Sequence, residues 1–199
     1  MSNIISLLDA INSEAKKLGF DPAANMHSGV TLDRIAEASR ELPFELPTEV
    51  VEIYRWRNGV KLGGRHGEIR LFPRCYLRSS EESIHATQEF ILLANDPLMA
   101  WRPSWFRLFD DLCGDCYAIE TSRTAEFGRI FAKEMGVFPA FWSIETMLTS
   151  VLECYRAGAY FLDDELGDLT EDEDISDAIY RRFNRGLSPH DSPPDDGTS

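Results

Sequence analysis

Apolar residues recur at helical spacing in three segments of the N-terminal part of the chain. The first segment covers about residues 3–18, the second covers 31–40, and the third begins at Thr48. Residues three and four positions apart share one face of a helix, so each pattern predicts an amphipathic helix. The dipeptide Asn58-Gly59 follows the third pattern and is typical of a left-handed helix stop.

Three more helices are predicted further along the chain. One begins at Ser79 or Ser80 and extends to Ala94, and the last covers about residues 173–185. Between them, the strongest helical pattern of the chain covers 143–158 and is wide enough to lie on the face of a sheet. The apolar face of that helix consists of Met147, Leu148, Val151, Leu152 and Tyr155.

Four segments have the pattern of strands. They cover residues 68–73, 105–110, 116–121 and 128–133, and the turn pair Gly114-Asp115 joins the second to the third. Short connections favour antiparallel pairing of neighbouring strands, so a meander is expected. The fold class predicted is α+β, with a mostly antiparallel sheet of about four or more strands and helices packed on it.

Composition and charge exclude several classes of protein. A chain of 199 residues with 43% hydrophobic residues can form a hydrophobic core. The net charge is −14, and the sequence shows no basic patch of the kind that binds nucleic acid. The longest apolar run, residues 90–94, is too short to cross a membrane, and the N-terminus lacks the features of a secretory signal. Four cysteines do not make a disulfide scaffold, so we expect a soluble cytoplasmic protein.

No familiar catalytic or metal-binding pattern occurs in the chain. The pair Cys113 and Cys116 has the spacing of half a zinc site, but a second pair is missing, so we predict no zinc and no disulfide there. The four histidines are scattered, and the glycine-rich stretch 63–67 precedes a predicted strand, the wrong order for a phosphate loop. We therefore expect no cofactor, no metal and no catalytic residue.

Four motifs, in order, resemble the SUKH superfamily, which is named for fungal cell-wall-assembly regulators and includes many bacterial immunity proteins. They are the Leu-Pro to Asn-Gly segment 46–59, the strand and Gly-Asp hairpin 105–115, the Gly-Arg-Ile-Phe strand 128–131 and the helix 143–160. The residues that carry the resemblance are Leu46, Pro47, Tyr54, Asn58, Gly59, Gly114, Gly128 and Gly158. The stretch 74–104 is long for that family, and the acidic tail is extra.

The resemblance divides the chain into four parts. Residues 31–162 form the SUKH-like α+β domain, preceded by an N-terminal helix and linker at 1–30. An acidic segment with the terminal helix follows at 163–187, and the Pro- and Asp-rich tail 188–199 is predicted to be disordered.

The resemblance also implies a function. It implies a non-enzymatic module with a concave protein-binding surface, which neutralises a toxin by direct contact in bacterial members and acts as a regulatory scaffold in fungal ones. A hypothesis of another class is a small metal-dependent hydrolase that uses Asp110, Asp111 and Asp115 with a histidine. The convergence of these acids with His66 or His85 in one pocket would favour the hydrolase.

The charge distribution suggests what the partner is like. Residues 163–177 contain nine acids and no base, and segment 163–199 carries a charge of −9, against −5 for the first 162 residues. Such a field attracts a basic protein partner, for example a toxin domain, rather than a nucleic acid or a membrane. The candidate contact residues, expected to be exposed at the loop and hairpin tip beside the sheet, are Trp101, Arg102, Asp110, Asp111 and Asp115.

Overall fold

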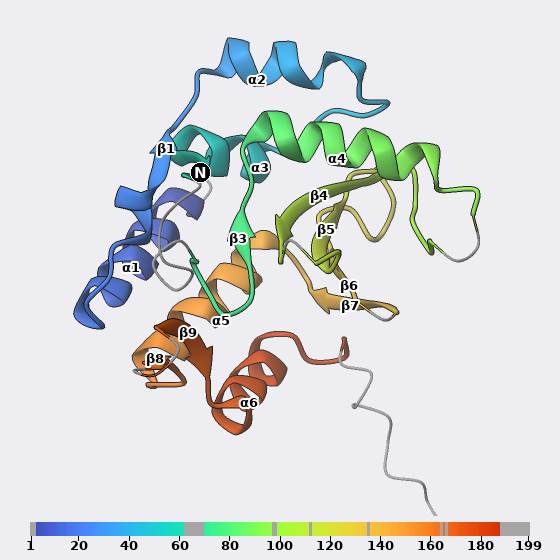
Figure 1. The fold of residues 1–199 in the computed structure, drawn as a ribbon. Helices are drawn as coiled ribbons and strands as arrows, with labels where there is room; N and C mark the ends of the chain where they lie inside the picture. Colours follow the sequence, from blue (N-terminus) through green and yellow to red (C-terminus); the bar gives the residue numbers. More distant parts are fainter. Residues whose placement is uncertain are drawn as a thin grey trace, which may run out of the picture.

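The computed structural model describes residues 3–61, 70–96, 99–111, 113–134, 136–163, 165 and 167–187. This part of the chain contains six α-helices and nine strands (Figure 1). The helices are α1 (Ile4–Lys17), α2 (Leu32–Ala38), α3 (Thr48–Trp56), α4 (Ser80–Leu92), α5 (Ile144–Arg156) and α6 (Glu173–Phe183). The strands are β1 (Met26–Ser28), β2 (Arg57–Val60), β3 (Tyr76–Leu77), β4 (Trp105–Asp110), β5 (Cys116–Glu120), β6 (Ile130–Lys133), β7 (Val137–Phe141), β8 (Tyr160–Asp163) and β9 (Asp168–Glu171).

The central sheet has five strands in the order β3-β4-β5-β6-β7, and every neighbouring pair is antiparallel. The predicted α+β class and the meander through β4, β5 and β6 are therefore confirmed. The sequence analysis missed β7, because Pro139 in its middle removes a backbone donor and is unusual inside a strand. Two further pairs, β1–β2 and β8–β9, form small separate sheets.

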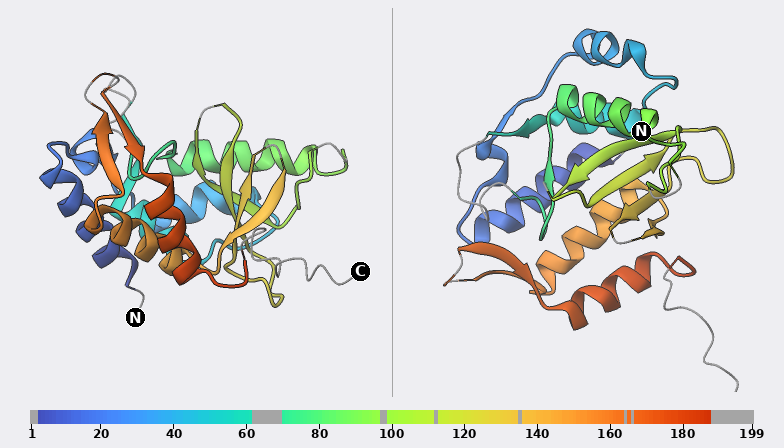
Figure 2. Two further views of the ribbon diagram at one scale, coloured as in Figure 1. Left: turned by 90° about the horizontal axis from the view of Figure 1, so that it is seen from below. Right: turned by 45° about the vertical axis from the view of Figure 1, so that its right-hand side comes forward.

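Helices cover both faces of the central sheet (Figure 2). The α4 helix lies on one side, and α5 and α6 lie on the other. Successive residues of a strand point to opposite faces, so β5 contributes Ile119 to the main core and Ala118 to a second, aromatic cluster. That aromatic cluster also contains Trp101, Trp105 and Phe131.

The α5 helix has the predicted position and the predicted buried face. Ser143 and Thr146 form a reciprocal cap at its N-terminus, and all five predicted face residues are buried. The N-terminal helix α1 lies along α5 and contributes residues such as Leu8 and Ile11 to the same core (Figure 1).

Two local predictions were wrong. No strand forms at residues 70–73, where Leu71 and Phe72 are both buried and lead into a turn, and the edge strand is β3 instead (residues 68 and 69 lie outside the described part). The Asn58-Gly59 pair does not stop a helix but belongs to β2, because the backbone is already extended at Arg57.

The acidic segment 163–177 includes ordered secondary structure. It contributes to the β8–β9 pair and begins α6, whose N-terminus is capped by the carboxylate of Asp172. Asp168 binds the Arg70 guanidinium at 2.8 and 3.0 Å, so part of the negative charge has a structural role.

Candidate functional site

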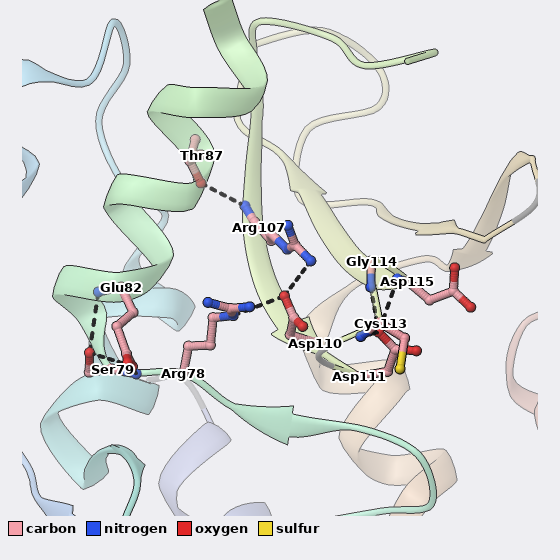
Figure 3. Close-up of polar contacts among 10 residues, drawn as sticks. All are labelled: Arg78, Ser79, Glu82, Thr87, Arg107, Asp110, Asp111, Cys113, Gly114 and Asp115. Atoms are coloured by element: carbon pink, nitrogen blue, oxygen red, sulfur yellow. Dashed lines mark hydrogen bonds and ion pairs between the residues drawn. The ribbon is translucent and has the colours of Figure 1, made fainter. Parts of the chain in front are cut away.

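Asp110 ends β4 at the point where the sheet meets the N-terminus of α4 (Figure 3). The side chain is fully buried, and its carboxylate is paired with both Arg78, at 2.9 Å, and Arg107. The backbone N–H of Arg107 donates to Thr87 on α4 at 3.0 Å, and the Arg107 guanidinium lies over the ring of Phe90. Asp110 therefore ties β4 to β3 and is no exposed contact residue, contrary to the expectation from the sequence.

Asp111 shapes the turn between β4 and β5. One of its carboxylate oxygens accepts hydrogen bonds from the backbone N–H groups of Cys113, Gly114 and Asp115 at 2.7, 3.0 and 3.0 Å (Figure 3). This local hydrogen bonding is the usual role of aspartate in a tight turn. The Asp115 side chain is exposed at this turn (Figure 3).

Trp101 and Arg102 lie beside the aromatic cluster. Trp101 is only 4% exposed and packs edge-on against Phe90 and Trp105, so its predicted exposure was wrong. Arg102 remains about half exposed, and its guanidinium lies 5.2 Å from the Trp105 ring centre and 5.1 Å from that of Phe131. Its Nη1 atom is 2.5 Å from a carboxylate oxygen of Glu126 and 3.5 Å from one of Glu120.

Glu120 is a buried carboxylate next to Arg102. It is 2% exposed and accepts hydrogen bonds from the indole of Trp105 at 3.1 Å and from the hydroxyl of Ser122 at 2.6 Å. Burial by itself raises the pKa of Glu120, but hydrogen bonds from Ser104, Ser122 and Trp105 outweigh that effect, and the net pKa is lowered. Glu120 is therefore a charged anchor for the loop that carries Arg102.

The structure does not bring the five predicted contact residues together. Asp110 is buried within the sheet, and Trp101 and Arg102 lie with the aromatic cluster on one face. Asp111 and Asp115 instead line a hollow of about 180 Å³ with Tyr117, which packs against the main core.

This hollow, which we name the hairpin pocket, is acidic. Its carboxylates are Asp111, Asp115, Glu134 and Glu171, and its cation is Arg74. Burial raises the pKa of Glu171, and the nearby carboxylates of Glu173 and Asp177 add to the effect, while Ser176 and Arg74 oppose it.

A larger depression of about 410 Å³ lies between β7 and α6, and we name it the α6 groove. Its lining consists of Tyr117, Glu134, Phe138, Pro139, Ala140, Phe141, Asp177, Tyr180, Arg181 and Asn184. The groove and the hairpin pocket share Tyr117, Glu134 and Tyr180 and so lie next to each other. Sequence reasoning missed the groove, because it depends on how α6 packs against β7, a strand that was not predicted.

The described residues contain no group of three or more His, Cys, Asp or Glu side chains that could hold a metal ion. His85 lies on the exposed side of α4 beside Glu89, and it lines neither the hairpin pocket nor the groove; His66 and His190 lie outside the described residues, as do Gly63–Gly67. Cys113 is exposed, whereas burial raises the pKa of the Cys116 thiol to about 11. A thiol with that pKa is protonated near neutral pH and is a poor nucleophile.

The helices within the described ranges are all too short or too polar to cross a membrane. The fold presents an antiparallel sheet between helices, with the acidic hairpin pocket and the partly apolar α6 groove beside it.

The chain belongs to the SMI1/KNR4 family (SUKH-1), whose sequence model matches residues 29–150. The match agrees with the resemblance found in the sequence, and it is consistent with an immunity-like or regulatory module. No curated protein matches the chain significantly.

The structure also explains several motif residues of this family. Tyr54 is completely buried against Phe106. The side-chain oxygen of Asn58 accepts a hydrogen bond from the N–H of Ser80 at 2.8 Å, and its amide donates to Glu81. Gly59 passes so close to Ser79 that an added Cβ would lie 2.3 Å from the Ser79 nitrogen. The Asn-Gly motif therefore docks α4 on β2.

Proposed function

We propose that this chain is a non-enzymatic protein-binding module of the immunity-like or regulatory kind. The observation that carries the proposal is the family match over residues 29–150, a range that includes the whole central sheet. The acidic depression beside the β4–β5 hairpin supports it, because it offers a partner both carboxylates and aromatic surface. Within this class we favour toxin neutralisation by direct contact, with a regulatory scaffold as the second form.

The contact residues of the proposal are chosen from the predicted side chains that are at least partly exposed. They are Asp111, Asp115 and Arg102, with Asp115 the most accessible carboxylate of the hairpin. Trp101 and Asp110 take part as positioning residues, since the first packs under the Arg102 loop and the second holds the end of β4.

The partner we propose is a basic protein met in the cytoplasm. The net charge of −14 makes long-range attraction to a cationic domain favourable. Electrostatic complementarity of this kind speeds association and discriminates between partners more than it adds to final affinity.

The metal-dependent hydrolase has no comparable support from the described residues. Asp110 is neutralised by two arginines, and one oxygen of Asp111 is occupied by three backbone N–H groups. Because His85 lies on an exposed helix side and lines neither depression, no acid–histidine set converges there.

The test is co-purification of tagged full-length chain from its native source after mild crosslinking. We expect one protein to be retained by the native chain and lost with Asp115→Lys, a reversal of charge at an exposed hairpin position. The matched control is Asp33→Lys, which reverses an exposed carboxylate on α2 and should leave the partner bound. Retention of no specific protein, or equal loss with both variants, would contradict the proposal.

A further inference from the structure

The two walls of the α6 groove differ in how they relate to the family. Tyr117 and the β7 residues Phe138 to Phe141 lie within the matched range 29–150. The opposite wall, formed by Asp177, Tyr180, Arg181 and Asn184, lies beyond the end of that range. The fold thus forms one groove from β7, which the family model covers, and α6, which it does not.

The α6 wall is held firmly against the rest of the molecule. Asn184 is 3% exposed; it accepts a hydrogen bond from the N–H of Trp142 at 3.2 Å and donates to Ser150 at 3.3 Å. The hydroxyl of Tyr180 is hydrogen-bonded to that of Tyr160, and the Tyr180 ring packs edge-on against Phe141. A wall that is already ordered lowers the conformational entropy lost when a partner binds.

The chemistry of the two adjacent hollows selects the occupant. The lining of the groove is aromatic or apolar at Tyr117, Phe138 and Phe141, which suits an apolar side chain. Five carboxylates line the hairpin pocket and the groove, against two arginines. Each of those two arginines already has a carboxylate partner, since Arg74 binds Glu173 at 3.1 Å and Arg181 binds Asp177 at 3.3 Å.

The geometry points to an extended occupant rather than a folded surface. β7 is the last strand of the central sheet, so a segment can lie along it between the strand and α6. Pro139 removes one backbone donor from that edge, and recognition therefore depends mainly on side chains.

We propose that the α6 groove binds an extended basic segment of a protein, with lysine or arginine in the hairpin pocket and an apolar side chain against Tyr117 and Phe138. This inference rests on the proposed function and deepens it. The helix α6, which lies outside the matched range, then determines which partner this member of the family accepts.

The test is selection of random dodecapeptides displayed on phage against the immobilised full-length chain. We expect peptides that combine basic and apolar residues, and at least about tenfold weaker binding of these peptides to Asp115→Asn/Glu134→Gln, a loss equal to about 1.4 kcal/mol. Both replaced side chains are exposed and line the hairpin pocket.

The matched control removes two charges elsewhere. Asp33→Asn/Glu37→Gln neutralises two exposed carboxylates of α2, and selected peptides should bind this variant as well as the native chain. A third variant, Asp177→Lys, reverses a charge on α6 and should shift the selection away from basic peptides. Failure to enrich any peptide, enrichment of peptides without basic residues, or an equal loss with the groove and α2 variants would overturn the inference.

The same variants separate this inference from the proposed function. A co-purified partner that binds Asp115→Asn/Glu134→Gln as tightly as the native chain would leave the binding module standing and remove the groove as its site. Selection of basic peptides that depends on the groove, without any co-purified partner, would support the groove and contradict the broader proposal.

Discussion

A single buried carboxylate, that of Asp110, connects three elements of the fold. It pairs with Arg78 after β3 and with Arg107 on β4, and Arg107 in turn contacts α4. Arg107 is only 6% exposed, so its charge depends on Asp110 for compensation. A buried ion pair adds little net stability over an apolar pair, but removal of one partner leaves the other charge uncompensated.

We therefore expect Asp110→Asn to lower the free energy of unfolding by about 3–5 kcal/mol. Equilibrium denaturation in urea, followed by tryptophan fluorescence, measures the change. The exposed neighbour Asp115 provides the control, since Asp115→Asn should stay within about 0.5 kcal/mol of the native chain. Similar stabilities of the two variants would show that the Asp110 pairs are dispensable.

Glu171 is a second residue whose environment affects stability, in this case through the pKa of its carboxyl group. Burial raises its pKa above the ordinary value of 4.5, so the folded chain binds a proton there more readily than the unfolded chain does. Stability from this group is then greatest at low pH and is lost as pH rises through the folded-state pKa.

Glu171→Gln should accordingly raise the melting temperature at pH 7, and the gain should shrink as the pH falls toward 4.5. Thermal unfolding followed by circular dichroism over that range tests the expectation. Glu134→Gln, at an exposed carboxylate of the same pocket, is the matched control. A gain that does not depend on pH would mean that the Glu171 charge is not the cause.

At the scale of elements, the contact between β2 and α4 depends on a glycine. Gly59 has φ of +81°, and a Cβ there would lie 2.3 Å from the backbone nitrogen of Ser79. Gly158 has a similar φ of +73°, but nothing lies within 4 Å of where its Cβ would be. A comparison of substitutions at these two positions therefore distinguishes the cost of backbone strain from the cost of steric overlap.

Gly158→Ala should cost about 1–2 kcal/mol, because left-handed backbone alone is unfavourable for alanine. Gly59→Ala should cost clearly more, since α4 must also move away from β2. Denaturation of both variants measures the difference. Equal losses would indicate that the β2–α4 contact yields to a methyl group without cost.

Parts of the fold with a strong local signal could be predicted from the sequence. The α5 helix follows from its apolar spacing and its Ser143 cap, and the β4–β5 hairpin follows from the Gly114 turn. The pattern of apolar residues could not show that Asn58 accepts a hydrogen bond from Ser80 at the start of α4, since that contact joins residues 22 positions apart. The exposure of Asp110 was wrong because its two arginine partners meet it only in the folded chain.

The candidate site was less predictable than the fold. Asp111 and Asp115 line the hairpin pocket because the turn directs them there, and the sequence did identify that turn. Tyr180 and Asp177 line the α6 groove only because α6 packs against the sheet. The local spacing of apolar residues does not predict that packing.

At the scale of the whole molecule, the acidic C-terminal region should attract a cationic partner. Some of its carboxylates must be kept in any test, because Asp168 binds Arg70 and Asp172 caps α6. Glu173 must also be kept, because it pairs with Arg74 of the hairpin pocket. The exposed acids Glu165 and Asp174 can be replaced by their amides with less harm to the fold.

For the partner identified by co-purification, we expect the association rate to fall as salt is raised and to fall again with this double replacement. The reason is that exposed charges are screened within about 8–10 Å at physiological ionic strength. The dissociation rate should change little, and surface plasmon resonance measures both rates. An association rate that is indifferent to both salt and replacement would contradict electrostatic steering, while leaving the binding module intact.

The packing of α1 along α5 has a practical consequence for anyone who shortens this chain. A fragment trimmed to residues 29–150 would end inside α5 and would lack α1 altogether. Leu148 and Val151 belong to the same core as Leu8 and Ile11, so the cut would remove one side of that core and uncover the other. Such a fragment should aggregate on expression, whereas one that spans residues 3–187 should remain folded.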